Sequence, residues 1–244
     1  MKIGILAAGN TPESLQDRYP AYAQMFIEQI SDIDPQLEFE VFDVRLNEFP
    51  KDCQVCDAWL ITGSRADAYS DEEWILNLCD LIRDIDQHGQ TLVGICFGHQ
   101  VIARALGGKV EKYSAGWGVG IHHYQLSEHV SLPHNLSAKE VAICAFHQDQ
   151  VVEKPNKMQT FLSSEFCQHA GLIFQDQILT FQAHPEFSKA YETELVKLYD
   201  GITLSAEVVS KAHQSIANYT LDSEHLMAWI TDFLKADKRA SKSS

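Results

Sequence analysis

The segment Gly94-Ile-Cys-Phe-Gly-His-Gln100, which continues into Val101-Ile-Ala-Arg-Ala-Leu-Gly-Gly108, decides the fold of this 244-residue chain. The apolar run that ends at Ile95 is typical of a buried strand, and the apolar residues after the segment repeat at helical spacing before a glycine pair. Cys96 is therefore predicted at a strand-to-helix turn, where the flanking glycines relieve the crowding of a sharp elbow. The N-terminus of the following helix favours the thiolate form of cysteine.

A cysteine nucleophile at this elbow needs a base, and the strongest candidate lies in Phe181-Gln-Ala-His-Pro-Glu-Phe187. The run Ile178–Phe181 is strand-like, and Pro185 keeps His184 out of helical geometry, so we expect the imidazole at a strand end. Glu186 can reach back to the second ring nitrogen and fix the tautomer. The sequence therefore predicts a Cys-His-Glu arrangement.

These two motifs together resemble the class I glutamine amidotransferase family, whose members hydrolyse the side-chain amide of glutamine. The resemblance extends to Leu60-Ile-Thr-Gly-Ser64, where the family has a glycine-rich oxyanion loop, and to Gly116-Trp-Gly118 and Phe146-His-Gln-Asp149. The blocks follow the family order over roughly residues 2 to 187. They are most similar to the amidotransferase domain of GMP synthase and its stand-alone relatives.

The resemblance implies specific roles for residues of this chain. The catalytic residues would be Cys96, His184 and Glu186. Backbone N–H groups of Phe97 and of Gly63 or Ser64 would stabilise the oxyanion. The α-amino and α-carboxyl groups of glutamine would be held by Gln100, Phe146, His147, Gln148 and Asp149. No cofactor and no metal are expected, and the substrate is a small molecule, either glutamine or another γ-glutamyl compound.

The chain departs from the synthase pattern at Arg65, because Gly63-Ser-Arg65 stands where those domains usually have Gly-Gly-Pro. We expect Arg65 to bring a cation near the mouth of the site, where it can pair with a carboxylate that follows the γ-glutamyl group. The chain also lacks a phosphate loop and an ATP-pyrophosphatase motif. Synthesis of an amide with ATP would therefore need a separate synthetase.

Composition limits the other partners and the compartment. A net charge of −15 argues against nucleic acid or an anionic membrane surface as the main partner. No apolar run has the length of a membrane span, and Ile3–Ala8 is too short for a signal peptide, so a cytoplasmic protein is expected. The six cysteines are then reduced thiols. Cys53-Gln-Val-Cys56 as a redox pair or half of a metal site is the less favoured interpretation.

The order of elements predicts the fold class. Strand-like runs at Lys2–Ala8, Leu37–Val41 and Ala58–Ile61 alternate with helical patterns, which indicates a flavodoxin-like three-layer α/β/α fold with a mostly parallel sheet. Shorter strand-like pieces between Val119 and Phe174 predict a small antiparallel insertion. We expect residues 1–200 to form the amidotransferase-like domain. Residues 201–244 would be a C-terminal helical extension packed on it, with a frayed tail from about 238.

Three functions remain open on the sequence alone. The first is an amidotransferase-type hydrolase that cleaves glutamine through a γ-glutamyl thioester, alone or supplying ammonia to a separate synthetase. The second is a stand-alone γ-glutamyl peptidase that uses the same triad. The third, a non-catalytic binding protein of the same fold, is the least favoured because Cys96, His184 and Glu186 are all present.

Overall fold

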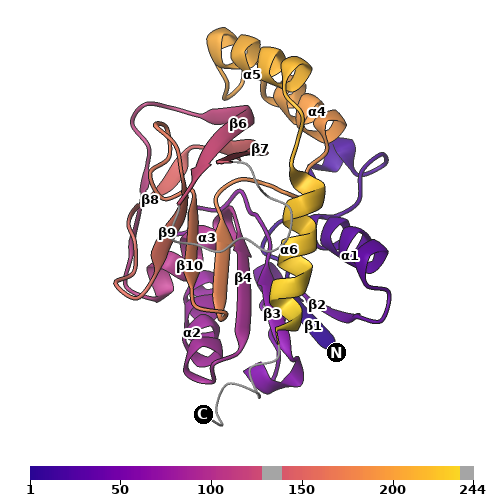
Figure 1. The fold of residues 1–244 in the computed structure, drawn as a ribbon, viewed down its shortest axis with the longest axis vertical. Coiled ribbons are helices and arrows are strands. Elements are labelled where there is room, and N and C mark those ends of the chain that lie inside the picture. The colour runs from indigo at the N-terminus through magenta and orange to yellow at the C-terminus, as the bar shows by residue number, and fades with distance from the viewer. Residues whose placement is uncertain (128–138, 237–244) are drawn as a thin grey trace.

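Five parallel strands form one side of the central sheet (Figure 1). The structure is a computed structural model, and it describes residues 1–127 and 139–236. The strands lie in the order β2 (Glu38–Phe42), β1 (Lys2–Leu6), β3 (Ala58–Ile61), β4 (Thr91–Ile95) and β11 (Ile178–Phe181). Every residue of β3, β4 and β11 is buried, as expected for apolar strands that are covered on both faces.

Antiparallel strands extend the same sheet beyond β11. They are β10 (Gly171–Phe174), β9 (Gln159–Ser163), β6 (Gly118–Leu126) and β7 (Glu140–His147), in that order. A separate two-stranded ribbon pairs β5 (Lys109–Lys112) with β8 (Asp149–Glu153). Gln148 separates β7 from β8, and the backbone N–H of His184, after β11, donates to the carbonyl of Cys144 in β7.

Helices cover both faces of the parallel strands (Figure 1). On one face lie α1 (Tyr22–Ile33) and α6 (Ser223–Lys235), and on the other lie α2 (Glu73–Gln87) and α3 (Phe97–Ala105). Alternation along β3 explains the two cores: Leu60 packs under α1 and α6, whereas Trp59 and Ile61 pack under α2 and α3. Three short 3-10 helices lie in the connections, at Glu13–Leu15, Val44–Leu46 and Cys53–Val55.

Two further helices, α4 (Lys189–Tyr199) and α5 (Ala206–Asn218), pack on the antiparallel strands. The Oγ of Ser215 in α5 accepts the N–H of Ile121 in β6 at 2.9 Å. Gly120 has a φ of +92°, and a Cβ there would lie 2.8 Å from Cα of Ala212, so glycine permits this close approach. Helices α4 and α5 thus pack closely against β6 and β7.

The architecture confirms the predicted fold class: a three-layer α/β/α protein with a large sheet whose central strands are parallel. The predicted antiparallel strands continue this sheet, since β10 pairs with β11. The ribbon of β5 and β8 was not predicted because its strands are short and partly exposed. The predicted domain boundary at 200 stays a prediction, and the predicted frayed tail from about 238 lies outside the described residues.

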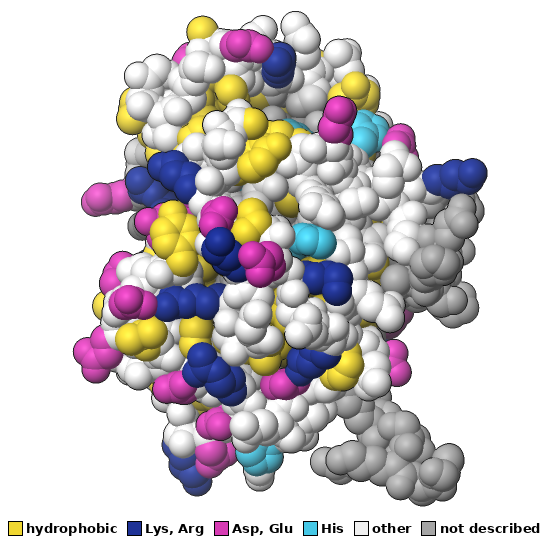
Figure 2. Space-filling model, turned by 90° about the vertical axis from the view of Figure 1, so that its left-hand side faces the viewer, with side chains coloured by type: hydrophobic (Ala, Val, Ile, Leu, Met, Phe, Trp, Pro, Cys, Tyr) yellow, Lys and Arg dark blue, Asp and Glu magenta, His cyan; other side chains and the backbone are white. Residues whose placement is uncertain are grey.

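The surface carries charges of both signs. On the face seen in Figure 2, Lys and Arg are interspersed with Asp and Glu, and hydrophobic side chains form small separate patches. In the described part of the chain, none of the helices has the length and apolar content needed to span a membrane.

Candidate active site

Cys96 lies at the sharp turn between β4 and α3, as the sequence predicts. Its backbone has a φ of +52° and a ψ of −101°, a conformation that non-glycine residues rarely adopt. The backbone N–H of Cys96 donates to the carbonyl of Phe181 at 2.7 Å, and its carbonyl accepts the N–H of Gln100. These bonds hold the strained residue between two strands and a helix, with the side chain only 6% exposed.

The two glycines of the elbow are required by close packing. A Cβ at Gly94 would lie 2.7 Å from the carbonyl group of Gly98, and a Cβ at Gly98 would lie 2.4 Å from the carbonyl oxygen of Ile61. Both distances are shorter than real Cβ contacts allow. The elbow can therefore reach this geometry only because residues 94 and 98 have no side chain.

His184 follows β11 and is fixed from three directions. Its backbone N–H donates to the carbonyl of Cys144 at 2.8 Å, and its ring stacks on Phe187 with 4.0 Å between centroids and 4° between planes. Its Nδ1 lies 2.8 Å from Oε1 of Glu186. The imidazole is thus held in one orientation. Its Nδ1 pairs with the Glu186 carboxylate, and Nε2 is the ring nitrogen that remains to interact with Cys96.

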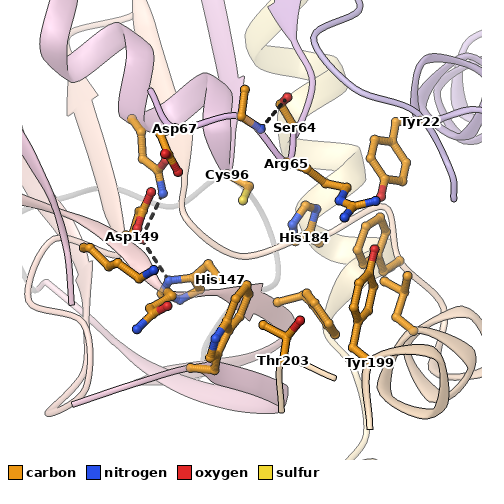
Figure 3. Close-up of a pocket in the computed structure, with 18 residues that line it drawn as sticks. Tyr22, Ser64, Arg65, Asp67, Cys96, His147, Asp149, His184, Tyr199 and Thr203 are labelled. Carbon is orange, nitrogen blue, oxygen red and sulfur yellow. Dashed lines mark hydrogen bonds between the residues drawn. The ribbon is translucent and has the colours of Figure 1, made fainter. Parts of the chain in front are cut away.

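The environment of His184 favours the imidazolium. Burial lowers the pKa of His184, but the Glu186 carboxylate and the Cys96 sulfur outweigh burial and raise it well above its ordinary value. Figure 3 shows Cys96 and His184 side by side in the middle of the cavity. This arrangement can hold a proton on the imidazole next to the sulfur of Cys96.

The loop after β3 lies directly against both side chains. A Cβ at Gly63 would be 2.8 Å from Cε1 of His184 and 3.7 Å from Cβ of Cys96. The loop is held by Thr62, whose Oγ1 accepts the N–H of Ala8 at 3.0 Å, and by Ser64, whose Oγ accepts the N–H of Ala66 at 3.1 Å. Gly63 therefore lies against Cys96 and His184, and the role of residues 63 and 64 as an oxyanion loop stays a prediction.

A cavity of about 270 Å³ surrounds these residues and extends to both sides of Cys96. Figure 3 shows Asp67, His147 and Asp149 on one side and Tyr22, Arg65 and Tyr199 on the other. The predicted substrate-binding residues all line the cavity: Arg65, Gln100, Phe146, His147, Gln148 and Asp149. Of the predicted oxyanion residues, Ser64 lines the cavity, Gly63 lies against Cys96 and His184, and Phe97 is the first residue of α3, directly after Cys96.

The Asp149 side of the cavity combines acidic and amide groups. Gln100 donates its side-chain N–H groups to the carbonyl of Asp149 at 2.9 Å and to Oε1 of Gln182 at 3.1 Å, so it ties the turn after β7 to the end of β11. Burial, followed by the charge of Asp67, raises the pKa of Asp149. Lys112 lines the same region and acts in the opposite direction on that pKa.

Sequence reasoning missed Gln182. It is fully buried, and its Nε2 lies 3.8 Å from Sγ of Cys96. The sequence did contain a signal for Gln182. Residues 182 and 184 are two positions apart directly after β11, so the alternation of the strand points their side chains to the same side. The cavity residues that were not predicted are Tyr22, Ala66, Asp67, Lys112, Phe187, Leu195, Tyr199 and Thr203. Trp117, noted in the sequence between two glycines, also lines the cavity.

His99 lies three residues after Cys96 in the sequence. It is completely buried, and its Nδ1 pairs with Oγ1 of Thr180 at 2.8 Å. Burial lowers the pKa of His99 to about 3. The reason is the direction of α3, which carries residue 99 away from Cys96 and under the sheet.

The other cysteines are buried, free thiols. Burial raises the pKa of Cys56 to about 11 and that of Cys167 to about 12, and it also raises the pKa of Cys53, Cys79 and Cys144. Such thiols are poor nucleophiles at neutral pH. Within the described ranges, no three His, Cys, Asp or Glu side chains are grouped so that they could hold a metal ion.

The fold and this site define a three-layer α/β/α protein with a cysteine at a strand-to-helix elbow. Residues 14–198 match the family described as glutamine amidotransferase class-I, and the chain belongs to this family. The resemblance noted in the sequence is thereby confirmed.

Individual relatives agree with this assignment. Gamma-glutamyl peptidase 2 of Arabidopsis thaliana is 30% identical over 232 residues, which cover 92% of this chain and 93% of that protein. The glutamine-hydrolyzing GMP synthase of Listeria innocua is 32% identical over 114 residues, 45% of this chain and 21% of the synthase. A glutamine amidotransferase structure from Methylobacillus flagellatus has a TM-score of 0.73 at 19% identity and covers 96% of this chain and 93% of that one, which supports the fold.

Proposed function

We propose that this protein hydrolyses γ-glutamyl amides, with Cys96 as nucleophile, His184 as acid and base, and Glu186 as the group that orients His184. The observation that carries the proposal is the position of the His184 ring, which is buried between the Glu186 carboxylate and the Cys96 sulfur. Membership of a family of amidotransferase-type hydrolases supports the same conclusion.

The reaction follows from the position of each group. The Cys96 sulfur attacks the δ-carbonyl carbon, an S–C bond forms, and the carbonyl oxygen becomes an oxyanion. His184 gives its proton to the departing nitrogen as the C–N bond breaks, which leaves a γ-glutamyl thioester. Water then attacks the thioester while His184 takes its proton. Glutamate leaves, and the sulfur is regenerated.

Backbone N–H groups would stabilise the oxyanion in both steps. Phe97 begins α3 directly after Cys96, so its N–H has no partner within the helix, and Gly63 in the loop after β3 lies against Cys96 and His184. Donors fixed by the fold need no reorganisation as charge develops. Losing one such donor typically slows turnover by about 10²–10³-fold.

Two substrate classes fit this chemistry, and the cavity favours γ-glutamyl peptides over free glutamine. Glutamine releases ammonia, which needs no binding surface on the leaving-group side. The cavity nevertheless continues past Cys96 to Arg65, Tyr199 and Thr203. The relative that matches over almost the full length of both chains is named a gamma-glutamyl peptidase, which supports the same choice. Supply of ammonia from glutamine to a separate synthetase is the second candidate.

The test is to measure glutamate release from glutamine and from γ-glutamyl dipeptides, with Cys96→Ala as the background control. A higher kcat/KM for the dipeptides is expected, with no second protein required. Release from glutamine only after a synthetase is added would favour the amidotransferase-subunit function. Failure of the wild type to act on either substrate above the Cys96→Ala background would reject the proposed function.

A further inference from the structure

Arg65 differs from the other arginines of the described residues in having no carboxylate partner. Each of the other four forms an ion pair with an acidic side chain: Arg18 with Glu194, Arg45 with Asp43, Arg83 with Asp80, and Arg104 with Asp71. For Arg65, the structure gives no hydrogen bond or ion pair within residues 1–127 and 139–236. In a chain with a net charge of −15, an unpaired cation at the mouth of the active site needs an explanation.

The guanidinium of Arg65 packs on the ring of Tyr199, a residue that is distant from it in the sequence. Its guanidinium carbon lies 5.5 Å from the ring centroid of Tyr199, the last residue of α4. A guanidinium at this distance from a tyrosine ring is attracted by the electrons of the ring face. The stacking leaves its N–H groups free to donate, and Figure 3 shows Arg65 between His184 and Tyr22.

The side of the cavity occupied by Arg65 is the side on which a leaving group would lie. Asp67 and Asp149 lie on the opposite side of Cys96, and the charge of Lys112 acts on Asp149, so charges suited to an amino-acid head group are present there. A γ-glutamyl group bound there, with its δ-carbonyl at the sulfur, directs whatever follows the scissile bond toward Arg65. The walls on this side are supplied by Tyr22, Leu195 and Tyr199.

We propose that Arg65 and Tyr199 form a leaving-group subsite that binds the carboxylate of an amino acid joined to the γ-glutamyl group. This inference rests on the proposed function and names its substrate class: γ-glutamyl amino acids and short γ-glutamyl peptides. Arginine suits the task because its planar fork donates two parallel hydrogen bonds to a carboxylate. Free glutamine has only the amide –NH₂ at this position and gains nothing from the subsite.

The same loop links this subsite to the reacting carbonyl. Ser64, whose backbone is a proposed oxyanion donor, immediately precedes Arg65. When the C–N bond breaks, the proton from His184 goes to the leaving nitrogen, and the free amino acid departs with its carboxylate. Arg65 would hold that carboxylate during bond cleavage, and its exposed position would then let the product exchange with solvent.

The experiment compares two substrates that differ only in the charge of the leaving group. They are γ-glutamylalanine, which has a free carboxylate, and γ-glutamylalaninamide, which has a neutral amide in its place. We would measure kcat/KM for both with wild type, Arg65→Gln and Tyr199→Leu, and binding of both to Cys96→Ala. The matched control is Arg45→Gln, which removes the same charge from an arginine paired with Asp43.

The kcat/KM of the wild type should be about tenfold higher for the carboxylate substrate. This factor lies between the effect of an exposed ion pair and that of a well-formed charged hydrogen bond. Arg65→Gln should bring that ratio close to one, and Tyr199→Leu should lower it in part, whereas Arg45→Gln should keep it. The preference should also weaken as salt is raised, because the pair lies at the rim. The same preference should appear in binding to Cys96→Ala.

Two results would overturn the subsite, and they differ from failure of the proposed function. If the wild type cleaves both substrates equally, or if Arg65→Gln lowers both rates by the same factor, Arg65 does not bind the leaving carboxylate. If neither substrate is cleaved or bound, the proposed function itself is wrong, and the subsite is wrong with it.

Discussion

Nδ1 of His184 lies 2.8 Å from Oε1 of Glu186, and the two side chains are 5% and 0% exposed. Because this pair is shielded from solvent, its electrostatic coupling is screened much less than that of a surface pair. The second carboxylate oxygen of Glu186 has no hydrogen-bond partner among the described residues. Among the described residues the imidazole is therefore the hydrogen-bond partner of the Glu186 carboxylate, which is why the pair is expected to act as a unit.

The first prediction concerns the nucleophile. A glutamine-like electrophile should label Cys96 and leave the other five cysteines unmodified, because Cys96 lines the cavity whereas the others do not, and burial raises the pKa of each of those five. Peptide mapping by mass spectrometry after labelling would identify the site. Labelling at full yield in Cys96→Ala would show that another residue is the nucleophile.

The second prediction separates the two histidines nearest the elbow. His184→Ala should lower turnover by about 10²–10⁴-fold, the range for loss of acid and base catalysis. His99→Ala should mainly lower the free energy of unfolding, because His99 is buried and bonded to Thr180. Steady-state kinetics and urea unfolding of both variants would test this. Near-normal turnover in His184→Ala with an inactive, folded His99→Ala would assign the base role to His99.

The third prediction concerns Glu186. In Glu186→Gln the amide oxygen can still accept the Nδ1 proton of His184, but the negative charge that raises the pKa of His184 is gone. The pKa of His184 should therefore fall, and kcat should fall less than in His184→Ala. The histidine signals in NMR spectra recorded across a pH titration would report the pKa. An unchanged pKa would mean that Glu186 does not stabilise the imidazolium.

The fourth prediction tests the packing of the elbow. In Gly98→Ala the new Cβ would lie 2.4 Å from the carbonyl oxygen of Ile61, so β3 and α3 must separate. We expect a loss of about 1–3 kcal/mol in the free energy of unfolding, together with lower turnover. Gly89→Ala is the comparison variant, since its Cβ meets nothing within 4 Å and only the positive φ opposes it. Normal activity and stability in Gly98→Ala would contradict this geometry.

The fifth prediction uses the buried carboxyl group of Glu192. Burial raises its pKa to about 8, although the N–H of Gly120 donates to it at 2.9 Å. From about pH 4.5, where the unfolded chain ionises, up to about pH 8, the folded state holds one more proton than the unfolded state. The contribution of Glu192 to stability is thus fully present below pH 4.5 and is lost as the pH rises to 8.

Glu192→Gln should remove this pH dependence, because glutamine stays neutral and can still accept the N–H of Gly120. Relative to wild type, its free energy of unfolding should rise between pH 5 and pH 8 by on the order of a few kcal/mol. Urea unfolding at the two pH values measures the change, with exposed Glu224→Gln as the control. Equal pH dependence in wild type and Glu192→Gln would contradict the raised pKa.

Much of the site was predictable because its two motifs are local. A run of apolar residues, a cysteine between glycines and an apolar helix are enough to predict the elbow at Cys96, since each feature depends on neighbours in the chain. The proline after His184 likewise predicts a residue at a strand end. The role of His99 was not predictable, because its environment depends on how α3 lies against Thr180 of β11.

The sequence by itself determined the elements, their order and the chemical groups at their ends. The tertiary structure decided which of these groups meet. β11 pairs in parallel with β4, with Phe181 opposite Ile95, and only this register brings the residues after Phe181 beside Cys96. In the same way, the contact between Arg65 and Tyr199 exists only because α4 returns to the loop after β3. Such contacts join residues far apart in the chain, and no local pattern of side chains specifies them.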